Sequence, residues 1–214
     1  MHIQSSLMKF NSPDTNHWIV SDLHLNHNKD FIYYRRGFND IQEHNREIIN
    51  NINKSVKEND VLFSLGDFCL NTNEEQLNVF LDSIICKNIY LLFGNHPNPL
   101  KKIYMREVYK KYKEDIEVYP FRYKNVIFLG NHFECIIQGK YVVMNHFPLE
   151  IWDHMKDGSY MLCGHSHYSF PRIRKASTDG LTLDCGWEGH NSVLNFNTVI
   201  DIMSKKTIRK VDHH

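Results

Sequence analysis

The fold is decided by the stretch His17-Trp18-Ile19-Val20-Ser21-Asp22-Leu23-His24, in which a short apolar run ends in a polar motif. Short apolar, β-branched runs bounded by turn residues predict buried strands. Similar runs cover 61–65, 89–93, 141–145 and 160–163, and they end at Gly66-Asp67, Gly94-Asn95-His96, His146 and Gly164-His165-Ser166-His167. Because ligands of open α/β sheets bind beyond the carboxyl ends of the strands, we expect the five motifs to meet in space.

The residue types in these motifs fit one chemistry. Asp, Asn and neutral His are hard to borderline oxygen and nitrogen donors, which suit Mn, Fe, Zn or Mg better than soft metals. No cysteine belongs to the set. A lone histidine in a strand is more often a packed core residue than a ligand, so the inference rests on the ordered set of five motifs. The sequence therefore predicts a two-metal site.

Length and composition are those of an ordinary globular protein. The chain has 214 residues, of which 42% are hydrophobic and 23% are charged, and Lys plus Arg and Asp plus Glu both total 25. This length allows a full core, and the absence of a Pro- or Gly-rich linker or an internal repeat predicts one domain over 1–214, with a motif-bearing core at about 17–186. Zero net charge excludes a global basic field for nonspecific nucleic-acid binding.

Cysteine usage and the amino-terminal sequence indicate the compartment. Five cysteines, an odd number without a Cys-x-x-Cys pair, favour a reducing environment. No basic region precedes an apolar stretch, and no apolar run approaches the roughly 20 residues that span a bilayer. We therefore expect a cytoplasmic protein with no membrane partner. His213 and His214 are excluded from the site as a tag remnant or a frayed tail.

Hydrophobic spacing predicts helices between and after the first three strands. We expect helices over 41–56, over 74–85 with Asn73 as the cap, over a basic segment at 101–113, and through Met203 with Asn197 as the cap. Further strands are expected at 116–119, 126–129, 133–137 and 181–185, with a hairpin turn at 138–140. This order, βαβαβ and then mostly β, predicts an α/β fold.

With these motifs the chain resembles the calcineurin-like metallophosphoesterase superfamily, whose signature is D-x-H, GD, GNH, a later H and GH-x-H. The resemblance covers residues 17–186. Details similar to small single-domain members from bacteria and their phages are Asp22-Leu23-His24-Leu25-Asn26-His27-Asn28, Arg36-Gly37-Phe38 and Leu65-Gly66-Asp67-Phe68. The resemblance implies a four-layer αββα sandwich with two mixed β-sheets.

The resemblance also implies a ligand set, carried over residue by residue. One divalent ion is bound by Asp22, His24, Asp67 and His167, and a second by Asp67, Asn95, His146 and His165. Asp67 bridges the two ions, for which Mn is favoured and Fe, Zn, Ni or Mg are alternatives. Two such ions about 3.5 to 4 Å apart share a hydroxide, lower its pKa and clamp the phosphoryl oxygens during in-line attack.

His96 is not implied as a metal ligand. Its family role is catalytic, because it protonates the leaving oxygen or stabilises the transition state. The family usually has Asp or Glu after Gly-Asn-His, whereas this chain has Pro97. That departure leaves the protonation of His96 and the turnover rate open.

Two further residues are candidate substrate ligands. His27 either contacts the substrate phosphate or faces solvent, and Arg36 either binds a nonbridging phosphate oxygen or forms a surface ion pair. Aromatic residues near the motif ends either stack on a nucleobase or pack under a loop; they are Trp152, Tyr168 and Trp187.

Three functions compete at this stage. The favoured one is a binuclear metal-dependent phosphoesterase acting on a phosphomonoester or phosphodiester, specifically a nucleotide-like small molecule. A metal-dependent nuclease on DNA or RNA is the second, because the basic segment carries Lys101, Lys102, Arg106, Lys110, Lys111 and Lys113, although Glu107 and Glu114 interrupt it. A catalytically weak metal-binding interaction module is the third, suggested by Pro97. The natural ester, the ion used in the cell and the oligomeric state stay open.

Overall fold

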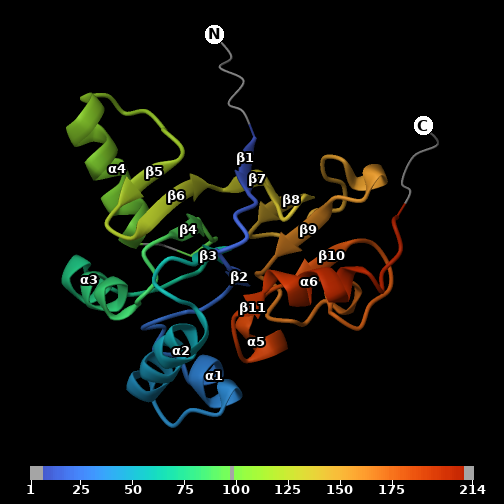
Figure 1. The fold of residues 1–214 in the computed structure, drawn as a ribbon. Coiled ribbons are helices and arrows are strands. Elements are labelled where there is room, and N and C mark those ends of the chain that lie inside the picture. The colour runs from blue at the N-terminus through green and yellow to red at the C-terminus, as the bar shows by residue number, and fades with distance from the viewer. Residues whose placement is uncertain (1–6, 97–98, 210–214) are drawn as a thin grey trace.

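The computed structural model describes residues 7–96 and 99–209, which form two β-sheets packed against each other (Figure 1). The six-stranded sheet has the order β11-β2-β3-β4-β6-β5, and the five-stranded sheet has the order β1-β7-β8-β9-β10. The strands are β1 Met8–Phe10, β2 His17–Val20, β3 Val61–Ser64, β4 Ile89–Leu92, β5 Phe121–Tyr123, β6 Val126–Gly130, β7 His132–Ile137, β8 Lys140–Asn145, β9 Tyr160–Cys163, β10 Thr182–Asp184 and β11 Leu194–Asn195.

Both sheets mix parallel and antiparallel pairs. In the six-stranded sheet β2, β3, β4 and β6 run parallel, while β5 and β11 pair antiparallel at the edges. In the five-stranded sheet only β7 and β8 pair antiparallel, through the hairpin turn predicted at 138–140. The predicted α/β class with two mixed sheets is confirmed.

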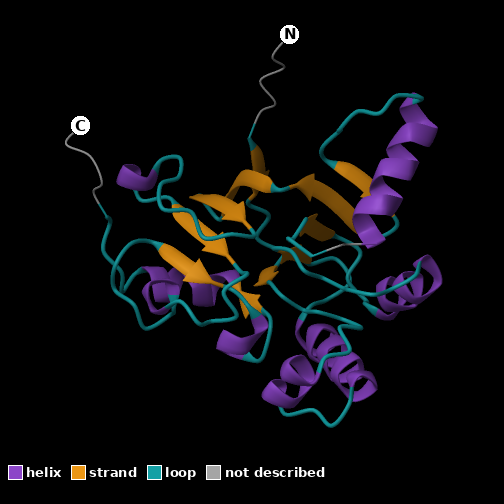
Figure 2. Cartoon of the chain, turned by 180° about the vertical axis from the view of Figure 1, so that it is seen from behind, coloured by secondary structure: helices purple, strands orange, loops and turns teal. Residues whose placement is uncertain are grey.

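The helices surround this pair of sheets. They are α1 Asp30–Tyr33, α2 Ile41–Ser55, α3 Glu74–Ser83, α4 Pro99–Tyr112, α5 Trp187–His190 and α6 Phe196–Met203, with 3-10 helices η1 Tyr34–Arg36, η2 Met155–Asp157 and η3 Pro171–Ile173. Seen from behind, the long helices gather around the six-stranded sheet, whereas loops and short helices dominate around the other (Figure 2).

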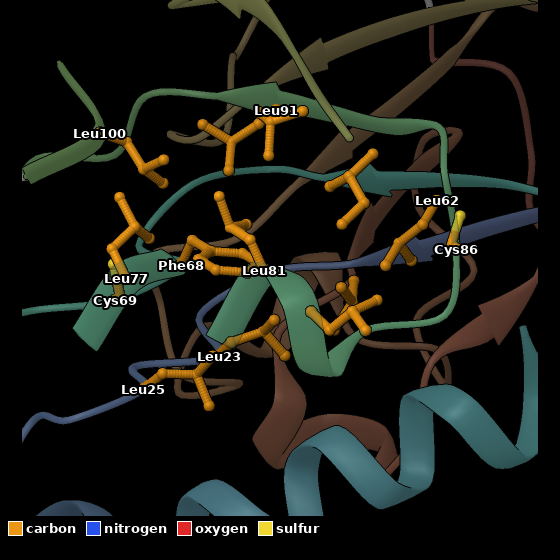
Figure 3. Close-up of a cluster of buried hydrophobic side chains, with 14 of the residues drawn as sticks. Leu23, Leu25, Leu62, Phe68, Cys69, Leu77, Leu81, Cys86, Leu91 and Leu100 are labelled. Atoms are coloured by element: carbon orange, nitrogen blue, oxygen red, sulfur yellow. The ribbon is translucent and has the colours of Figure 1, made fainter. Parts of the chain in front are cut away.

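One hydrophobic cluster joins α2, α3 and α4 to the outer face of the six-stranded sheet. Leu77 and Leu81 of α3 belong to this cluster together with Leu62 and Leu91 on the strands (Figure 3), and all four are fully buried. Burying a leucine side chain contributes about 1.5–3 kcal/mol, so this face is a main source of stability.

A second cluster fills the space between the sheets. Phe63 and Leu92 from the six-stranded sheet meet Met144 and Leu162 from the five-stranded sheet. On the far face of the five-stranded sheet, a third cluster packs Trp152, Met155 and Ile173 against the strands, so η2, η3 and their loops form the fourth layer. The expected sandwich is therefore present.

Helix and strand limits follow the sequence with three corrections. Asn73 caps α3 as predicted, through a capping box with Gln76. Asn195, not Asn197, caps α6, since its side chain accepts a hydrogen bond from the Asn197 amide. Residues 116–119 form no strand, because the Val118 amide donates to the Tyr104 hydroxyl and its carbonyl accepts from it. The strands β1, β5 and β11 were not predicted.

All five cysteines are buried and unpaired. Within residues 7–96 and 99–209, none of the helices combines the length and apolarity that crossing a bilayer requires.

Candidate metal centre

The predicted site residues lie at the carboxyl ends of neighbouring strands from both sheets. Asp22, Asp67 and Asn95 follow β2, β3 and β4, which are adjacent in the six-stranded sheet. His146 and the 165–167 loop follow β8 and β9, which are adjacent in the five-stranded sheet. The site therefore forms where the ends of the two sheets meet.

Asp22, His24 and His167 form one group with metal-binding spacing. Nε2 of His24 lies 3.7 Å from Oδ1 of Asp22, and the His24 and His167 rings stack with centroids 4.9 Å apart. Both Asp22 Oδ1 and His24 Nε2 are buried and have no hydrogen-bond partner. A buried polar atom without a partner costs free energy, and a cation between these two atoms would satisfy both.

Asp67, Asn95, His146 and His165 form the second group. Nε2 of His146 lies 3.3 Å from Asp67 Oδ2 and 2.8 Å from Asn95 Oδ1, and Nδ1 of His165 lies 3.1 Å from the same amide oxygen. Nδ1 of His146 is 3.0 Å from the Leu65 carbonyl, so it carries the proton and leaves the Nε2 lone pair for a ligand bond.

Asp67 lies between the two groups. Its Oδ2 atom is 3.3 Å from His146 Nε2 and 4.0 Å from His24 Nε2. This is the position that a carboxylate needs in order to bridge two cations, because it faces one histidine from each group.

The protonation states also fit cations. Burial raises the pKa of Asp22 and of Asp67, but contacts with His24 and His146 outweigh it and hold both carboxyl pKa values below the ordinary range. Burial lowers the pKa of His24 and of His165, so both stay neutral near pH 7. The other two histidines differ: burial lowers the pKa of His146, but its contact with Asp67 outweighs this and raises it, and the contact with Glu188 raises the pKa of His167. A cation bound at these two rings would therefore compete with a proton.

Five site residues have a left-handed backbone. The φ angles are 57° for Asp22, 52° for His24, 48° for Asp67, 66° for His165 and 46° for His167. Non-glycine residues rarely adopt this region, and each instance costs about 1–3 kcal/mol. Such strain persists only where the surrounding structure fixes it, so the directions of these side chains are set by the fold.

Two glycines allow the close approach of the motif loops. A Cβ atom on Gly94 would lie 2.0 Å from Asp67 Oδ1, and one on Gly164 would lie 1.9 Å from Ser21 Oγ and 2.4 Å from Asp22 Oδ2. The glycines in the Gly-Asn-His and Gly-His-Ser-His motifs are thus needed because carboxylates pass directly over them.

His96 lies at the mouth of the site. Its amide donates to Asp67 Oδ1 at 3.3 Å, and its Nε2 is 3.9 Å from Asp67 Oδ2, while 38% of its side chain is exposed. The ring is 5.6 Å from that of His24. It is therefore close to the ligands and reachable by a substrate. The effect predicted for Pro97 falls outside the described residues.

Arg36 supports the site from behind. Its guanidinium donates to the carbonyl oxygens of Asp22 and Leu23 at 2.7 and 2.9 Å, contacts His44 Nε2 at 2.9 Å, and pairs with Glu188 through Nε and Nη2. The side chain is 1% exposed. All five N–H groups of Arg36 thus have partners, so the sequence interpretation as a phosphate ligand is wrong, and so is its surface alternative.

His27 is also buried, so the solvent-facing alternative for this residue is wrong. Its Nδ1 lies 3.1 Å from Nδ1 of His24, and its ring is 5.6 Å from that of His96. Burial lowers the pKa of His27 to about 4, so the ring is neutral. Contact with a substrate phosphate stays a prediction.

Two supporting carboxylates were missed by sequence reasoning. Glu188 accepts from Nδ1 of His167 at 2.9 Å. Asp184 accepts from the hydroxyl of Ser166 and from the Tyr168 amide, which holds the loop that carries His165 and His167. Their common signal is an acidic residue at or just beyond the end of β10, at the same edge of the sheet as the motifs.

The other aromatic candidates are engaged in packing. Trp187 and Trp152 are buried. The Tyr168 ring packs against His190 and Arg174, and its hydroxyl accepts from the Lys175 amide.

The basic helix α4 is partly neutralised. Arg106 pairs with Glu74 and Glu107, and Lys110 pairs with Glu107. Lys101 lies over the Phe93 ring. Fewer free cations therefore remain for a polymer phosphate backbone than the sequence suggests.

Comparisons with known proteins agree with this geometry. Residues 16–174 match the family model described as calcineurin-like phosphoesterase. An uncharacterized protein of Methanocaldococcus jannaschii, MJ1445, is 32% identical over 79 residues, which are 37% of this chain and 45% of that protein. The chain therefore matches less than half of that relative's length. A protein of unknown function from Aquifex aeolicus, AQ665, has a TM-score of 0.59 at 16% identity and covers 88% of this chain and 100% of its own; this likeness concerns the fold alone.

Proposed function

Because the chain belongs to the calcineurin-like phosphoesterase family, we propose that it is a binuclear metal-dependent phosphoesterase. Its substrate is a phosphomonoester or phosphodiester, specifically a nucleotide-like small molecule. The observation that carries the proposal is the pair of buried atoms, Asp22 Oδ1 and His24 Nε2, that face each other without a hydrogen-bond partner. They lie beside a second group of donors that shares Asp67.

In this proposal each residue has a defined task. One divalent ion would be held by Asp22, His24, Asp67 and His167, and the other by Asp67, Asn95, His146 and His165, with Mn favoured. Such ions supply Lewis acidity and a hydroxide nucleophile near neutral pH. Asn95 contributes an uncharged oxygen, so the site keeps enough positive charge to attract a phosphate ester. His96, whose side chain is 38% exposed at the mouth, donates a proton from Nε2 to the leaving oxygen.

The test combines metal content with turnover of a generic aryl phosphate. Asp67→Asn is expected to abolish both, whereas His96→Ala keeps the metal and lowers kcat by about 10²- to 10⁴-fold. Asp157→Asn is the matched control, because the Asp157 carboxylate is 61% exposed and lies beside His154 on η2. Wild-type turnover by Asp67→Asn would overturn the proposal, and so would wild-type turnover that survives complete removal of metal.

The salt dependence of the rate distinguishes a nuclease activity from this proposal. Polymer cleavage that depends on the basic helix falls steeply as salt rises, whereas hydrolysis of a small ester does not.

We also propose that residues 1–214 form one metallophosphoesterase domain, since both sheets share one core, and that the protein is cytoplasmic, since its five cysteines are unpaired.

A further inference from the structure

Two exposed phenylalanines contact the site histidines. Phe147, directly after His146, is 46% exposed, and its ring centroid is 4.5 Å from that of His165 and 5.3 Å from that of His146. Phe31 in α1 is 59% exposed, and its ring is 5.9 Å from that of His27. Phe31 therefore contacts one histidine and Phe147 contacts two, while about half of each phenylalanine is exposed.

Core packing does not account for either ring. Neither phenylalanine belongs to the three hydrophobic clusters found among the described residues. Single exposed apolar residues are common on protein surfaces, but these two differ from the others because their rings contact histidines of the candidate site. The aromatic residues expected from the sequence to stack on a base, Trp152, Tyr168 and Trp187, are instead buried or engaged.

The two rings lie at different ends of the row of histidines. Phe31 packs on His27, whose ring is 5.6 Å from that of His96, the proposed proton donor to the leaving oxygen. Phe147 packs on His165, which contacts Asn95 in the second metal group. If His96 protonates the leaving oxygen, Phe31 would lie on the leaving-group side of a phosphorus atom at the metal centre, and Phe147 on the side of the group that phosphorus retains.

We propose that Phe31 and Phe147 are specificity-determining residues, and that the substrate is a phosphodiester with a flat ring, such as an aryl group or a nucleobase, on each side of phosphorus. A monoester presents only one substituent, so it uses only one of the two surfaces. The inference rests on the proposed esterase function. Hydrolysis breaks one P–O bond, adds water's hydroxyl group to phosphorus and gives the other proton to the leaving oxygen.

The kinetic test compares bis(4-nitrophenyl) phosphate with 4-nitrophenyl phosphate on the Mn-loaded enzyme. Stacking on an aromatic side chain is typically worth about tenfold or more in binding per ring. Phe147→Ala is therefore expected to lower the diester-to-monoester ratio of kcat/KM by about tenfold, and Phe147→Leu by less, because leucine keeps the apolar volume but not the flat face. An unchanged ratio in both variants overturns the inference.

A binding test separates this inference from the esterase proposal. Diphenylphosphinate and phenylphosphonate carry two rings and one ring on phosphorus through P–C bonds that are not hydrolysed, so calorimetric titration of the Mn-loaded protein needs no turnover. Phe31→Ala and Phe147→Ala are each expected to weaken the binding of diphenylphosphinate by about tenfold. Equal affinity of both variants and the wild type overturns the inference even if hydrolysis is normal.

Two exposed residues close in sequence to the phenylalanines serve as matched controls. Tyr34→Ala and Ile151→Ala remove side chains from residues that are 60% and 64% exposed, close in sequence to Phe31 and Phe147, without a ring contact to a site histidine. Both are expected to bind diphenylphosphinate as the wild type does. If the two control variants bind diphenylphosphinate as weakly as the phenylalanine variants do, general surface apolarity explains the effect and the proposed subsites are wrong.

Discussion

Glu188 accepts a hydrogen bond from Nδ1 of His167 at 2.9 Å, which leaves Nε2 of His167 for the metal centre. The contact raises the pKa of His167 and helps to lower the pKa of Glu188 to about 2 against the effect of its burial. A carboxylate in this place fixes the tautomer and the direction of the ring, and such partners change metal affinity without touching the ion.

Glu188→Gln is expected to weaken Mn binding by about 10- to 100-fold, because the neutral amide no longer increases the basicity of His167. Calorimetric titration of the metal-free protein measures this. Glu150→Gln removes a carboxylate that pairs with Arg172 and Arg209 on the surface, and it should bind Mn as the wild type does. Equal Mn affinity in the two variants would show that the contact with Glu188 is only structural.

Arg36→Met is expected to lower the free energy of unfolding by about 3–5 kcal/mol, because it leaves the Glu188 carboxylate without its buried partner. The Arg36 side chain is 1% exposed and that of Glu188 19% exposed, so solvent compensates little. Urea unfolding in EDTA measures the change. The double variant Arg36→Met/Glu188→Gln should recover part of the loss, whereas Arg172→Met, from an exposed pair, should cost less than about 1 kcal/mol.

Gly164→Ala is expected to lose Mn binding and about 1–3 kcal/mol of stability, because the new methyl group cannot share space with the Asp22 carboxylate. Metal content after dialysis, with circular dichroism as a check on folding, measures both effects. Gly139→Asn is the control, since nothing lies within 4 Å of its Cβ position and asparagine tolerates the positive φ there. Full metal content in Gly164→Ala would mean that the motif loops can separate without harm.

Asp60, which is not among the site residues, makes a pH-dependent contribution to the free energy of unfolding. Its carboxylate accepts hydrogen bonds from the amides of Asn16 and Lys57 and from the side chains of Asn16 and Trp18. Burial raises the pKa of Asp60, but these donors outweigh it and leave the pKa below its ordinary value of 3.8. A folded pKa below the unfolded one stabilises the protein above pH 3.8, and this stabilisation is lost as pH falls through the folded value.

Asp60→Asn should therefore be less stable than the wild type by about 2–3 kcal/mol at pH 7, and the difference should shrink below about pH 4. Urea unfolding in EDTA at several pH values measures it. Asp82→Asn is the control, because the Asp82 side chain is 68% exposed. If the difference in unfolding free energy stays constant down to pH 3, the loss of stability comes from the changed shape of the side chain and not from the loss of its charge.

The strands that carry the motifs were predictable because the apolar run that marks each buried strand lies within a few consecutive residues. Val61–Ser64 and Tyr160–Cys163 are buried at every position, so each appears in the sequence as a continuous apolar run. The polar residue that ends each run is then placed by the parallel pairing of neighbouring strands. Parallel pairing explains convergence only within each sheet; the meeting of the two sheets at one edge was implied by the family resemblance and not by the strand pattern.

Features that depend on distant contacts were not predictable. The run at 116–119 has strand-like composition, but the Tyr104 hydroxyl takes both backbone hydrogen-bonding groups of Val118. Arg36 has the chemistry of a phosphate ligand, and only the fold turns its guanidinium toward main-chain carbonyl groups. Glu188 belongs to no motif, so its role appears only when His167 is placed beside it.

The ligands come from both sheets, and this has a consequence for the whole molecule. Asp22, Asp67 and Asn95 follow strands of one sheet, while His146 and His165 follow strands of the other. Ions bound between them, as proposed, would act as a reversible cross-link between the early part of the chain and the late part, much as a disulfide constrains a long loop. Removal of the ions by a chelator would therefore weaken the contact between the two sheets as well as remove the reactive centre.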